Sequence, residues 1–295
     1  MNTKAESQAW ADFWREDQAR GGCLSNASAE LEASVALWHG FAASLPAKAK
    51  VLDLGTGDGA VLKQLGSRRR DLRMVGVDSA PLLPPAKGKM RLQANVAMEA
   101  LPFQPAAFDA VVSQFGYEYG DTTRAAPEVR RVLSSGGRFL FLVHHRDGPV
   151  VSHNRRRAEA LGWILDGGLL DRARSLASTR QTLPLPTPPS FAEAVREADS
   201  TFGQSSVAAE ITRAIWQALA PGPSPRDSLD ALGELERKAK SELLRLKALD
   251  AAARDDTEAR QLVEELRGAG LEADDPGTLN NRSGQPYAWT LAGRG

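Results

Sequence analysis

The sequence predicts an α/β protein built on an open and mostly parallel sheet. Short apolar segments alternate with helical patterns between residues 51 and 146, as expected when crossover helices join parallel strands. A glycine-rich turn in VLDLGTGDGA, residues 51–60, joins the first strand to a helix. Residues 148–256 break this alternation, because they carry helical stripes and no strand signal. We therefore expect a helical insert after the fifth strand.

Two helices are expected before the sheet. Trp10, Phe13 and Trp14 share one helical face. A second apolar stripe follows a Gly-Gly-Cys break, at Leu31, Val35, Trp38 and Phe41. The aromatic stripe of the first helix either covers a ligand or packs in the core, and its spacing favours packing. Cys23 is the only cysteine, which excludes an intrachain disulfide and fits a reducing compartment.

Short apolar runs predict the strands of the sheet. The expected strands are Val51–Leu54, Arg73–Val77, Met90–Ala94, Ala110–Ser113 and Phe139–His144. A helix through Val61, Leu62 and Leu65 follows the first strand. Another helix runs from about Thr123 to Leu133, and we expect Gly136 and Gly137 to stop it.

The insert contains two proline-rich joints, at residues 182–189 and 221–225. Ser224-Pro225-Arg226-Asp227 predicts a capped helix start at the second joint. A final helix, Thr257–Arg267, and a strand, Pro286–Ala292, close the chain. The predicted parts are residues 1–147 for the N-terminal helices and the α/β core, 148–256 for the insert, and 257–295 for the last helix and closing strands of the core.

The charge balance argues against polyanionic partners. Lys plus Arg and Asp plus Glu both total 37, so the formal net charge is zero. Without a long-range field we expect neither nucleic acid nor membrane as a partner. The N-terminal segment lacks a signal-peptide core, and the apolar run 139–143 is too short to cross a bilayer. These features predict a cytoplasmic protein.

The glycine-rich turn is the segment that carries chemistry. Gly55 and Gly57 allow the backbone to approach a ligand, and the following helix presents free N–H groups. Asp78 ends the next strand, where a carboxylate can accept hydrogen bonds from ribose hydroxyls. A dinucleotide site stays open on this spacing, because Gly55, Gly57 and Ala60 also fit GxGxxG/A. Asp53 argues against it, since a carboxylate there would repel a pyrophosphate.

This segment resembles the glycine-rich motif of class I methyltransferases that use S-adenosyl-L-methionine (SAM). MEALPF (98–103), FDAVVSQFGYEY (108–119) and EVRRVLSSGGRFLFLVHH (128–145) are similar to later motifs of the small-molecule branch of that family, methyltransferase type 11. The resemblance implies a Rossmann-like seven-stranded sheet of order 3-2-1-4-5-7-6, with the seventh strand antiparallel. It also implies SAM as the cofactor and methyl transfer as the activity.

Matching the motifs residue by residue implies the cofactor contacts. They are methionine contacts at Asp53, Gly55 and Gly57, ribose contacts at Asp78, an adenine-facing turn at Ala97 and Met98, and further contacts at Thr56, Ser79, Ser113 and Gln114. Many relatives have an acid in the place of Ala97. Adenine must here rely on backbone N–H groups and on packing by Met98. We expect no metal ligand set.

The ends of the fourth and fifth strands are expected to face the acceptor, a small molecule. We predict acceptor contacts at Phe115, Tyr117 and Tyr119, although the tyrosines could equally pack under a lid. Methyl transfer depends mainly on alignment, and a base is needed only when the acceptor must lose a proton. His145 is the first candidate base and His144 the second, although either could be a structural donor.

Three functions stay open at this point. The first is a small-molecule methyltransferase whose insert forms an acceptor lid. The second is a SAM-binding regulatory or assembly module without transfer activity, and the third is a nicotinamide-dependent oxidoreductase. The insert could instead stabilise the fold or form a homodimer contact. SQFG stands after the fourth strand, where nucleic-acid adenine methyltransferases carry an Asn/Asp-Pro-Pro-aromatic tetrad, so nucleic acid is not expected as the acceptor.

Overall fold

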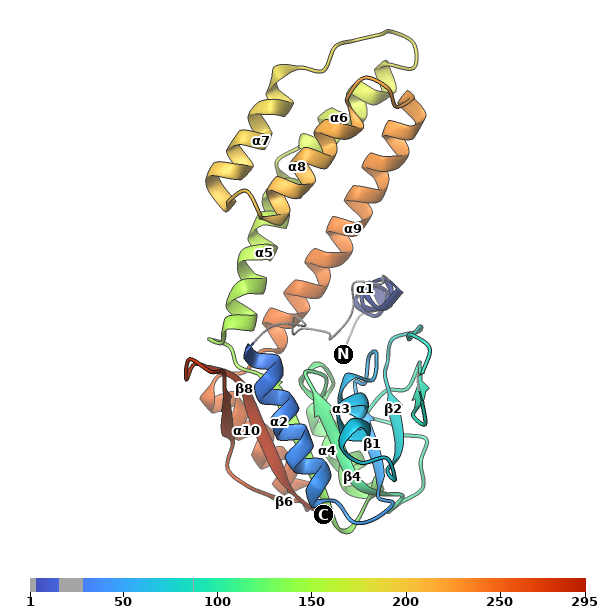
Figure 1. Cartoon of the computed structure of the whole chain (residues 1–295), viewed down its shortest axis with the longest axis vertical. Coiled ribbons are helices and arrows are strands. Elements are labelled where there is room, and N and C mark those ends of the chain that lie inside the picture. Colours follow the sequence, from blue (N-terminus) through green and yellow to red (C-terminus); the bar gives the residue numbers. More distant parts are fainter. Residues whose placement is uncertain (1–3, 16–28, 87) are drawn as a thin grey trace. The chain divides into compact units, whose positions relative to one another are not determined.

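The computed structural model describes residues 4–15, 29–86 and 88–295, and Cys23 lies outside them. The chain forms two compact units. Unit 1 consists of Met1–Ser152 and Ala248–Gly295, and unit 2 of His153–Lys247. Unit 1 contains the sheet, whereas unit 2 is helical (Figure 1). None of the helices in the described ranges is both long enough and apolar enough to cross a membrane.

The sheet has the predicted doubly wound order. Its strands are β1 (Lys50–Leu54), β2 (Arg73–Val77), β3 (Arg91–Gln93), β4 (Phe108–Gln114), β5 (Leu133–His144), β6 (Glu272–Ala273), β7 (Gly277–Asn280) and β8 (Pro286–Arg294). The order is β3-β2-β1-β4-β5-β8-β6, and β7 also pairs with β8. Strands β1 to β5 pair in parallel, and β8 runs antiparallel to β5. The predicted strand beyond the antiparallel one is therefore divided into two short pieces, β6 and β7.

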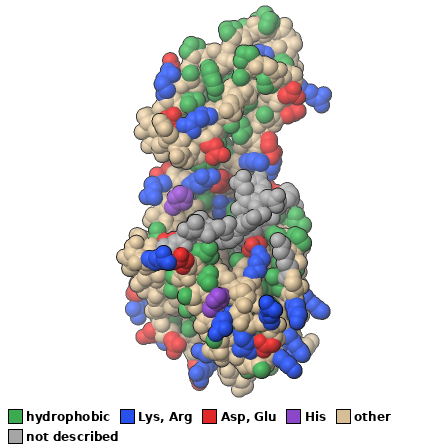
Figure 2. Space-filling view, in the orientation of Figure 1, with side chains coloured by type: hydrophobic (Ala, Val, Ile, Leu, Met, Phe, Trp, Pro, Cys, Tyr) green, Lys and Arg blue, Asp and Glu red, His purple; other side chains and the backbone are tan. Residues whose placement is uncertain are grey.

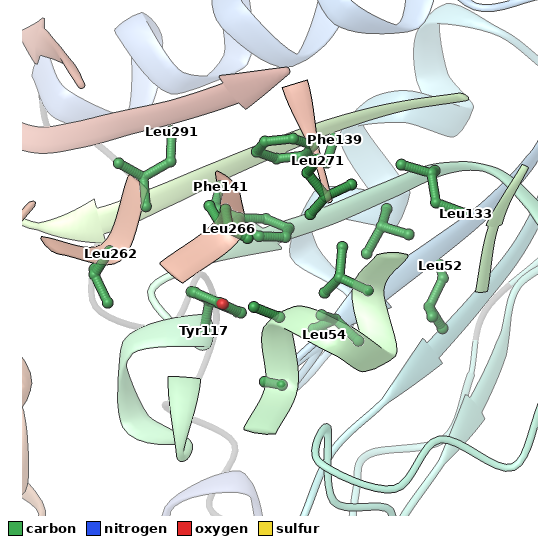
Figure 3. Close-up of a cluster of buried hydrophobic side chains, with 14 of the residues drawn as sticks. Leu52, Leu54, Tyr117, Leu133, Phe139, Phe141, Leu262, Leu266, Leu271 and Leu291 are labelled. Carbon is green, nitrogen blue, oxygen red and sulfur yellow. The ribbon is translucent and has the colours of Figure 1, made fainter. Parts of the chain in front are cut away.

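Helices cover both faces of the sheet. Successive residues of a strand point to opposite faces, and both sets are therefore buried beneath helices. The helices of unit 1 are α1 (Lys4–Arg15), α2 (Ala29–Ser44), α3 (Ala60–Arg68), α4 (Thr122–Val132) and α10 (Asp256–Gly268), with a 3₁₀ turn at Tyr117–Tyr119. Val51 and Leu140 pack with α2 and α3. Leu52 and Phe139 pack with α4 and α10 on the other face (Figure 3). The two helices predicted before the sheet are confirmed.

The glycine pair after α4 has a different role from the one predicted. The helix ends at Val132, and β5 begins at Leu133, before Gly136 and Gly137. The pairing of β4 with β5 shifts between Phe108 and Ala110, and Gly136 adopts a positive φ of 70°. These glycines therefore lie in an irregular stretch at the start of β5 and do not stop the helix.

Unit 2 consists of helical segments with their own core. Its chain runs through α5 (Pro149–Asp166), α6 (Leu169–Thr179), α7 (Pro189–Phe202), α8 (Val207–Ala218) and α9 (Pro225–Ala252), of which α5 begins in unit 1 and α9 ends there. Leucine, isoleucine and alanine side chains such as Leu161, Ile215 and Leu232 form the core. The predicted cap of α9 is present, since the Ser224 Oγ accepts from the Asp227 N–H and donates to the Asp227 carboxylate.

Candidate functional site

The turn after β1 and the turn after β4 touch each other. Gly55, Gly57 and Gly59 have φ values of 65°, 51° and 75°, a region that glycine enters without strain. A Cβ atom added to Gly55 would lie 2.8 Å from the Cα of Gly116, and one added to Gly116 would lie 2.8 Å from the carbonyl oxygen of Leu54. Glycine is therefore required on both sides of this contact.

Asp53 lies beneath the glycine-rich turn. Its side chain is buried, and its Oδ2 accepts a 2.7 Å hydrogen bond from the Thr56 hydroxyl. Its Oδ1 is buried and accepts no hydrogen bond from a described residue. Burial raises the pKa of Asp53 to about 8, with the nearby Asp78 and Asp58 carboxylates adding to the shift and the Thr56 bond opposing it. The site thus holds one buried acceptor that lacks a donor.

Asp78 follows β2 and joins the two neighbouring turns. Its Oδ2 accepts from the Gly57 N–H and its Oδ1 from the Ala80 N–H, both at 2.9 Å. Burial raises the pKa of Asp78, and these two backbone bonds partly offset the rise. Because each carboxylate oxygen has a second lone pair, both oxygens retain capacity for a ligand hydroxyl.

A pocket of about 400 Å³ opens at this carboxyl edge of the sheet. Its wall combines backbone turns, aromatic rings and charged groups. Predicted site residues in the wall are Gly55, Asp78, Ser79, Ala97, Met98, Phe115 and Tyr119. Residues that we did not predict are Trp10, Val77, Val96, Glu99, Ala100, Gly116, Gly120 and Arg124. The turns after β1, β2, β3 and β4 therefore meet at one cavity, as expected for an open α/β sheet.

The other predicted cofactor residues lie behind this wall. Asp53 and Thr56 bond each other, and the N–H of Gly57 is taken by Asp78. The Ser113 hydroxyl donates to the Leu54 carbonyl and accepts from the Tyr117 N–H, so it ties β1 to the turn after β4.

Two further predicted residues also lie outside the pocket wall. Gln114 Oε1 accepts from the Trp38 indole at 2.6 Å. Tyr117 is fully buried, stacks on Phe141 with ring centroids 4.5 Å apart, and donates to the Thr122 carbonyl (Figure 3). Tyr117 thus belongs to the hydrophobic core in this structure.

Phe115 is held in a strained backbone conformation. Its φ is 55°, which is rare for an aromatic residue and costs about 1–3 kcal/mol. Its N–H donates to the Leu142 carbonyl, and its ring stacks on His144 with centroids 4.1 Å apart. The hydrogen bond and the ring stacking offset this strain and hold one aromatic side chain of the pocket wall in place.

The two histidines at the end of β5 have different surroundings. His144 is fully buried, and its Nδ1 lies 2.8 Å from the Glu118 Oε1, which also accepts the His144 N–H. His145 is partly exposed and stacks on Trp289 with centroids 4.6 Å apart. Burial lowers the pKa of His145, and Asp147 opposes the shift. Neither histidine lines the pocket.

Some of the unpredicted residues had a signal in the sequence. Trp10 belongs to the aromatic stripe of α1, where its ring meets Tyr119 edge to face at 5.5 Å. Glu99 lies inside the MEALPF motif and accepts from the Asp121 N–H. Arg124 is exposed in the first turn of α4, and a single arginine there gives no sequence signal. The pocket wall therefore carries two acidic side chains and one basic one.

A second groove of about 800 Å³ lies at the opposite edge of the sheet, between α2 and the ends of β5, β6 and β8. Its charged lining residues are Arg138, Arg294, Glu272 and Asp274. None of the site residues predicted from the sequence lines this groove. The glycine-rich turn that predicted a ligand site therefore lies at the carboxyl edge and not at this groove.

Comparison with known proteins finds a family match for the part of the sheet that contains β1 to β5. A family model described as a methyltransferase domain matches residues 52–141. An uncharacterised methyltransferase of Mycobacterium bovis is 34% identical over 148 residues, which are 48% of this chain and 55% of that protein. A demethylmenaquinone methyltransferase of Thermus thermophilus is 38% identical over 103 residues, which are 32% of this chain and 46% of that protein. The chain spans about half the length of these curated relatives.

A solved structure of a SAM-dependent methyltransferase from Aquifex aeolicus aligns with 97% of this chain and 97% of its own. Its sequence identity is 9% and its TM-score 0.44. The family match covers residues 52–141, which include every residue of the pocket wall except Trp10.

Proposed function

We propose that the chain transfers the methyl group of SAM to an oxygen, nitrogen or carbon atom of a small molecule, because residues 52–141 match a methyltransferase domain and the curated relatives are named as methyltransferases. The relative from Thermus thermophilus is named for demethylmenaquinone, which supports a small-molecule acceptor. The proposal rests on one observation, that the glycine-rich turn, Asp78 and the Ala97–Met98 turn meet at the same pocket.

The residues around this pocket suit SAM. The buried Oδ1 of Asp53 lacks a donor, and the ammonium of the methionine portion could supply one directly or through water. Both oxygens of Asp78 can accept a further hydrogen bond, as two ribose hydroxyls require. Ala97 and Met98 offer packing for adenine. A volume of about 400 Å³ lies within the range of small-molecule pockets.

The chain's own residues would act mainly by alignment. SAM supplies a methyl group on a sulfonium, a leaving group that needs no acid. Holding an acceptor in line with that methyl group contributes up to about 7–11 kcal/mol. Phe115 and Tyr119 would orient the acceptor, since both line the pocket and Phe115 is fixed by its backbone. Tyr117 would support them from the core.

A base would be needed only for an acceptor that loses a proton. His145 is our candidate, because it is partly exposed and its lowered pKa keeps the ring neutral at pH 7. His144 is fully buried beside Glu118, and its ring stacks on Phe115. We therefore propose that His144 holds the Phe115 ring in position and does not act as the base.

We further propose that the helical insert, residues 148–256, forms the acceptor lid. Its five helices, α5 to α9, pack around a core of their own, and its proline-rich joints lie between these helices. Hydrogen exchange should test this. Amides of unit 2 should exchange more slowly when S-adenosylhomocysteine and an acceptor are both bound, whereas exchange that ignores both ligands would favour a structural or dimer role.

Calorimetry tests the cofactor. SAM and S-adenosylhomocysteine should bind in the micromolar range and NAD should not bind detectably. Tight NAD binding without SAM binding would refute the proposal in favour of an oxidoreductase. SAM binding without turnover on a broad panel of acceptors would instead favour the regulatory or assembly module.

A further inference from the structure

One end of unit 2 is built from two segments without charged residues, although Arg180 and Arg226 lie directly beside them. Residues 181–192 and 214–225 contain no Asp, Glu, Lys or Arg, although charged residues make up 25% of the chain. These segments include the α6–α7 connection and the α8–α9 connection, which lie at the same end of the unit (Figure 1). We name residues 181–188 and 219–224, together with Trp216, the unit 2 tip.

The tip is held in a fixed shape by Arg180. Its guanidinium donates to the carbonyl oxygens of Leu185 and Leu219 and to the Thr187 hydroxyl, each at 2.8 Å. The Thr187 hydroxyl donates in turn to the Leu219 carbonyl at 2.7 Å. The proline-rich loop is thereby tied to the end of α8, and its side chains need little further ordering when they bind.

The tip exposes large apolar side chains. Among the described residues, the large hydrophobic side chains that stand exposed are Leu82, Leu183, Leu185 and Trp216, so three of the four belong to the tip. Leu183 is 54% exposed, and Leu185 and Trp216 are each 38% exposed. Figure 2 shows this end of unit 2 mainly in the colours of hydrophobic and uncharged atoms. Such a concentration favours an interaction surface over scattered surface residues.

Prolines reduce the cost of taking this backbone out of water. Of the 17 prolines in the chain, seven lie in residues 181–192 and 214–225. A proline has no N–H group, so it leaves no donor unpaired in a medium that cannot accept a hydrogen bond. The loops can therefore enter a poorly hydrated region with fewer lost hydrogen bonds than ordinary loops.

We propose that the unit 2 tip docks on the surface of an uncharged lipid bilayer, with its leucine and tryptophan side chains in the interfacial layer. The three exposed side chains offer on the order of 300 Å² of apolar surface, whereas each partner in a stable protein interface buries about 800 Å², of which roughly 450 Å² is apolar. A bilayer interface accepts a small apolar insertion and favours tryptophan. The zero net charge argues against electrostatic attraction to anionic lipid, but it does not oppose apolar insertion.

Vesicle flotation tests this on the full chain. The protein should float with phosphatidylcholine vesicles to the same extent at 0.1 M and 0.5 M sodium chloride, because an uncharged contact is not screened. Adding phosphatidylglycerol should not be required. Brominated phosphatidylcholine should quench part of the tryptophan emission, and Trp216→Phe should remove that part.

Substitution of the exposed leucines provides the matched control. Leu183→Ser with Leu185→Ser should reduce partitioning at least about tenfold. Leu82→Ser, which alters the exposed leucine of unit 1, should leave it unchanged. Equal flotation of all variants, binding only to anionic vesicles, or binding lost at high salt would each overturn the proposal. So would a wild-type dimer that the double variant abolishes while vesicles bind neither protein.

Discussion

Replacing Asp53 with Asn should make the protein more stable, and increasingly so as the pH rises. In the folded chain burial raises the pKa of Asp53 from 3.8 to about 8. The native state therefore keeps a proton that the unfolded chain releases near pH 4, so this residue's contribution to stability is lost as the pH rises from about 4 to about 8. Asparagine copies the protonated acid in shape and can still accept from Thr56.

The size of the effect follows from the pKa difference. Each pH unit between the two pKa values changes stability by about 1.4 kcal/mol. Between pH 5 and pH 8 the advantage of Asp53→Asn over wild type should grow by as much as about 4 kcal/mol. The change of this advantage with pH is the quantity to measure. Any pH-independent cost of exchanging an acid for an amide is the same at every pH and cancels from that change.

Urea denaturation followed by circular dichroism, at pH 5, 6, 7 and 8, measures this difference. The transition should be assigned to unit 1, since two compact units need not unfold together. If the difference in unfolding free energy between Asp53→Asn and the wild type stayed constant from pH 5 to pH 8, Asp53 would have an ordinary pKa in the folded chain. That result would refute the reasoning. Asp53→Asn should also bind SAM more weakly, because a bound ammonium lowers the pKa of a neighbouring acid and can pair with the carboxylate of Asp53, which asparagine cannot form.

Four further substitutions test the site. Asp78→Ala should weaken SAM binding at least about tenfold in calorimetry, since charge-assisted hydrogen bonds are worth about 1.5–3 kcal/mol each; unchanged affinity would remove Asp78 from the ribose site. Gly116→Ala should weaken binding as well, because its Cβ would lie 2.8 Å from the Leu54 carbonyl, and an unaltered Kd would show that the turns can separate. His145→Gln should lower kcat without weakening SAM binding if the acceptor loses a proton. Full activity in both the His145→Gln and His144→Gln variants would exclude a histidine base.

The sheet could be predicted because its signals are local. Each strand is a short apolar run and each turn carries glycine or aspartate, so sequence spacing alone predicts the elements. The family resemblance predicted that the last strand is antiparallel. Its register against β5 could not be predicted from the sequence. The prediction that Gly136 and Gly137 end the preceding helix was wrong, because glycine is found at strand irregularities as well as beyond helix ends.

The pocket wall was only partly predictable, for a physical reason. Residues that follow strands, such as Asp78 and Phe115, were found because strand ends converge at one edge. Trp10 comes from a helix far away in the sequence, and spacing could not distinguish a pocket wall from core packing. The strained φ of Phe115 and the burial of His144 are tertiary properties, which no pattern of residue types reports.

The position of β8 has a consequence for how the protein is made. This strand pairs with β5 along seven residue pairs, Arg138↔Arg294 to His144↔Ala288, yet all of unit 2 and α10 are synthesised between them. At translation rates of about 5–20 residues per second, β5 waits with an open edge for on the order of ten seconds. Unit 2 can fold during that interval, whereas unit 1 cannot close its sheet. An unpaired apolar edge invites aggregation, so the nascent chain should depend on chaperones at this stage more than the finished protein does.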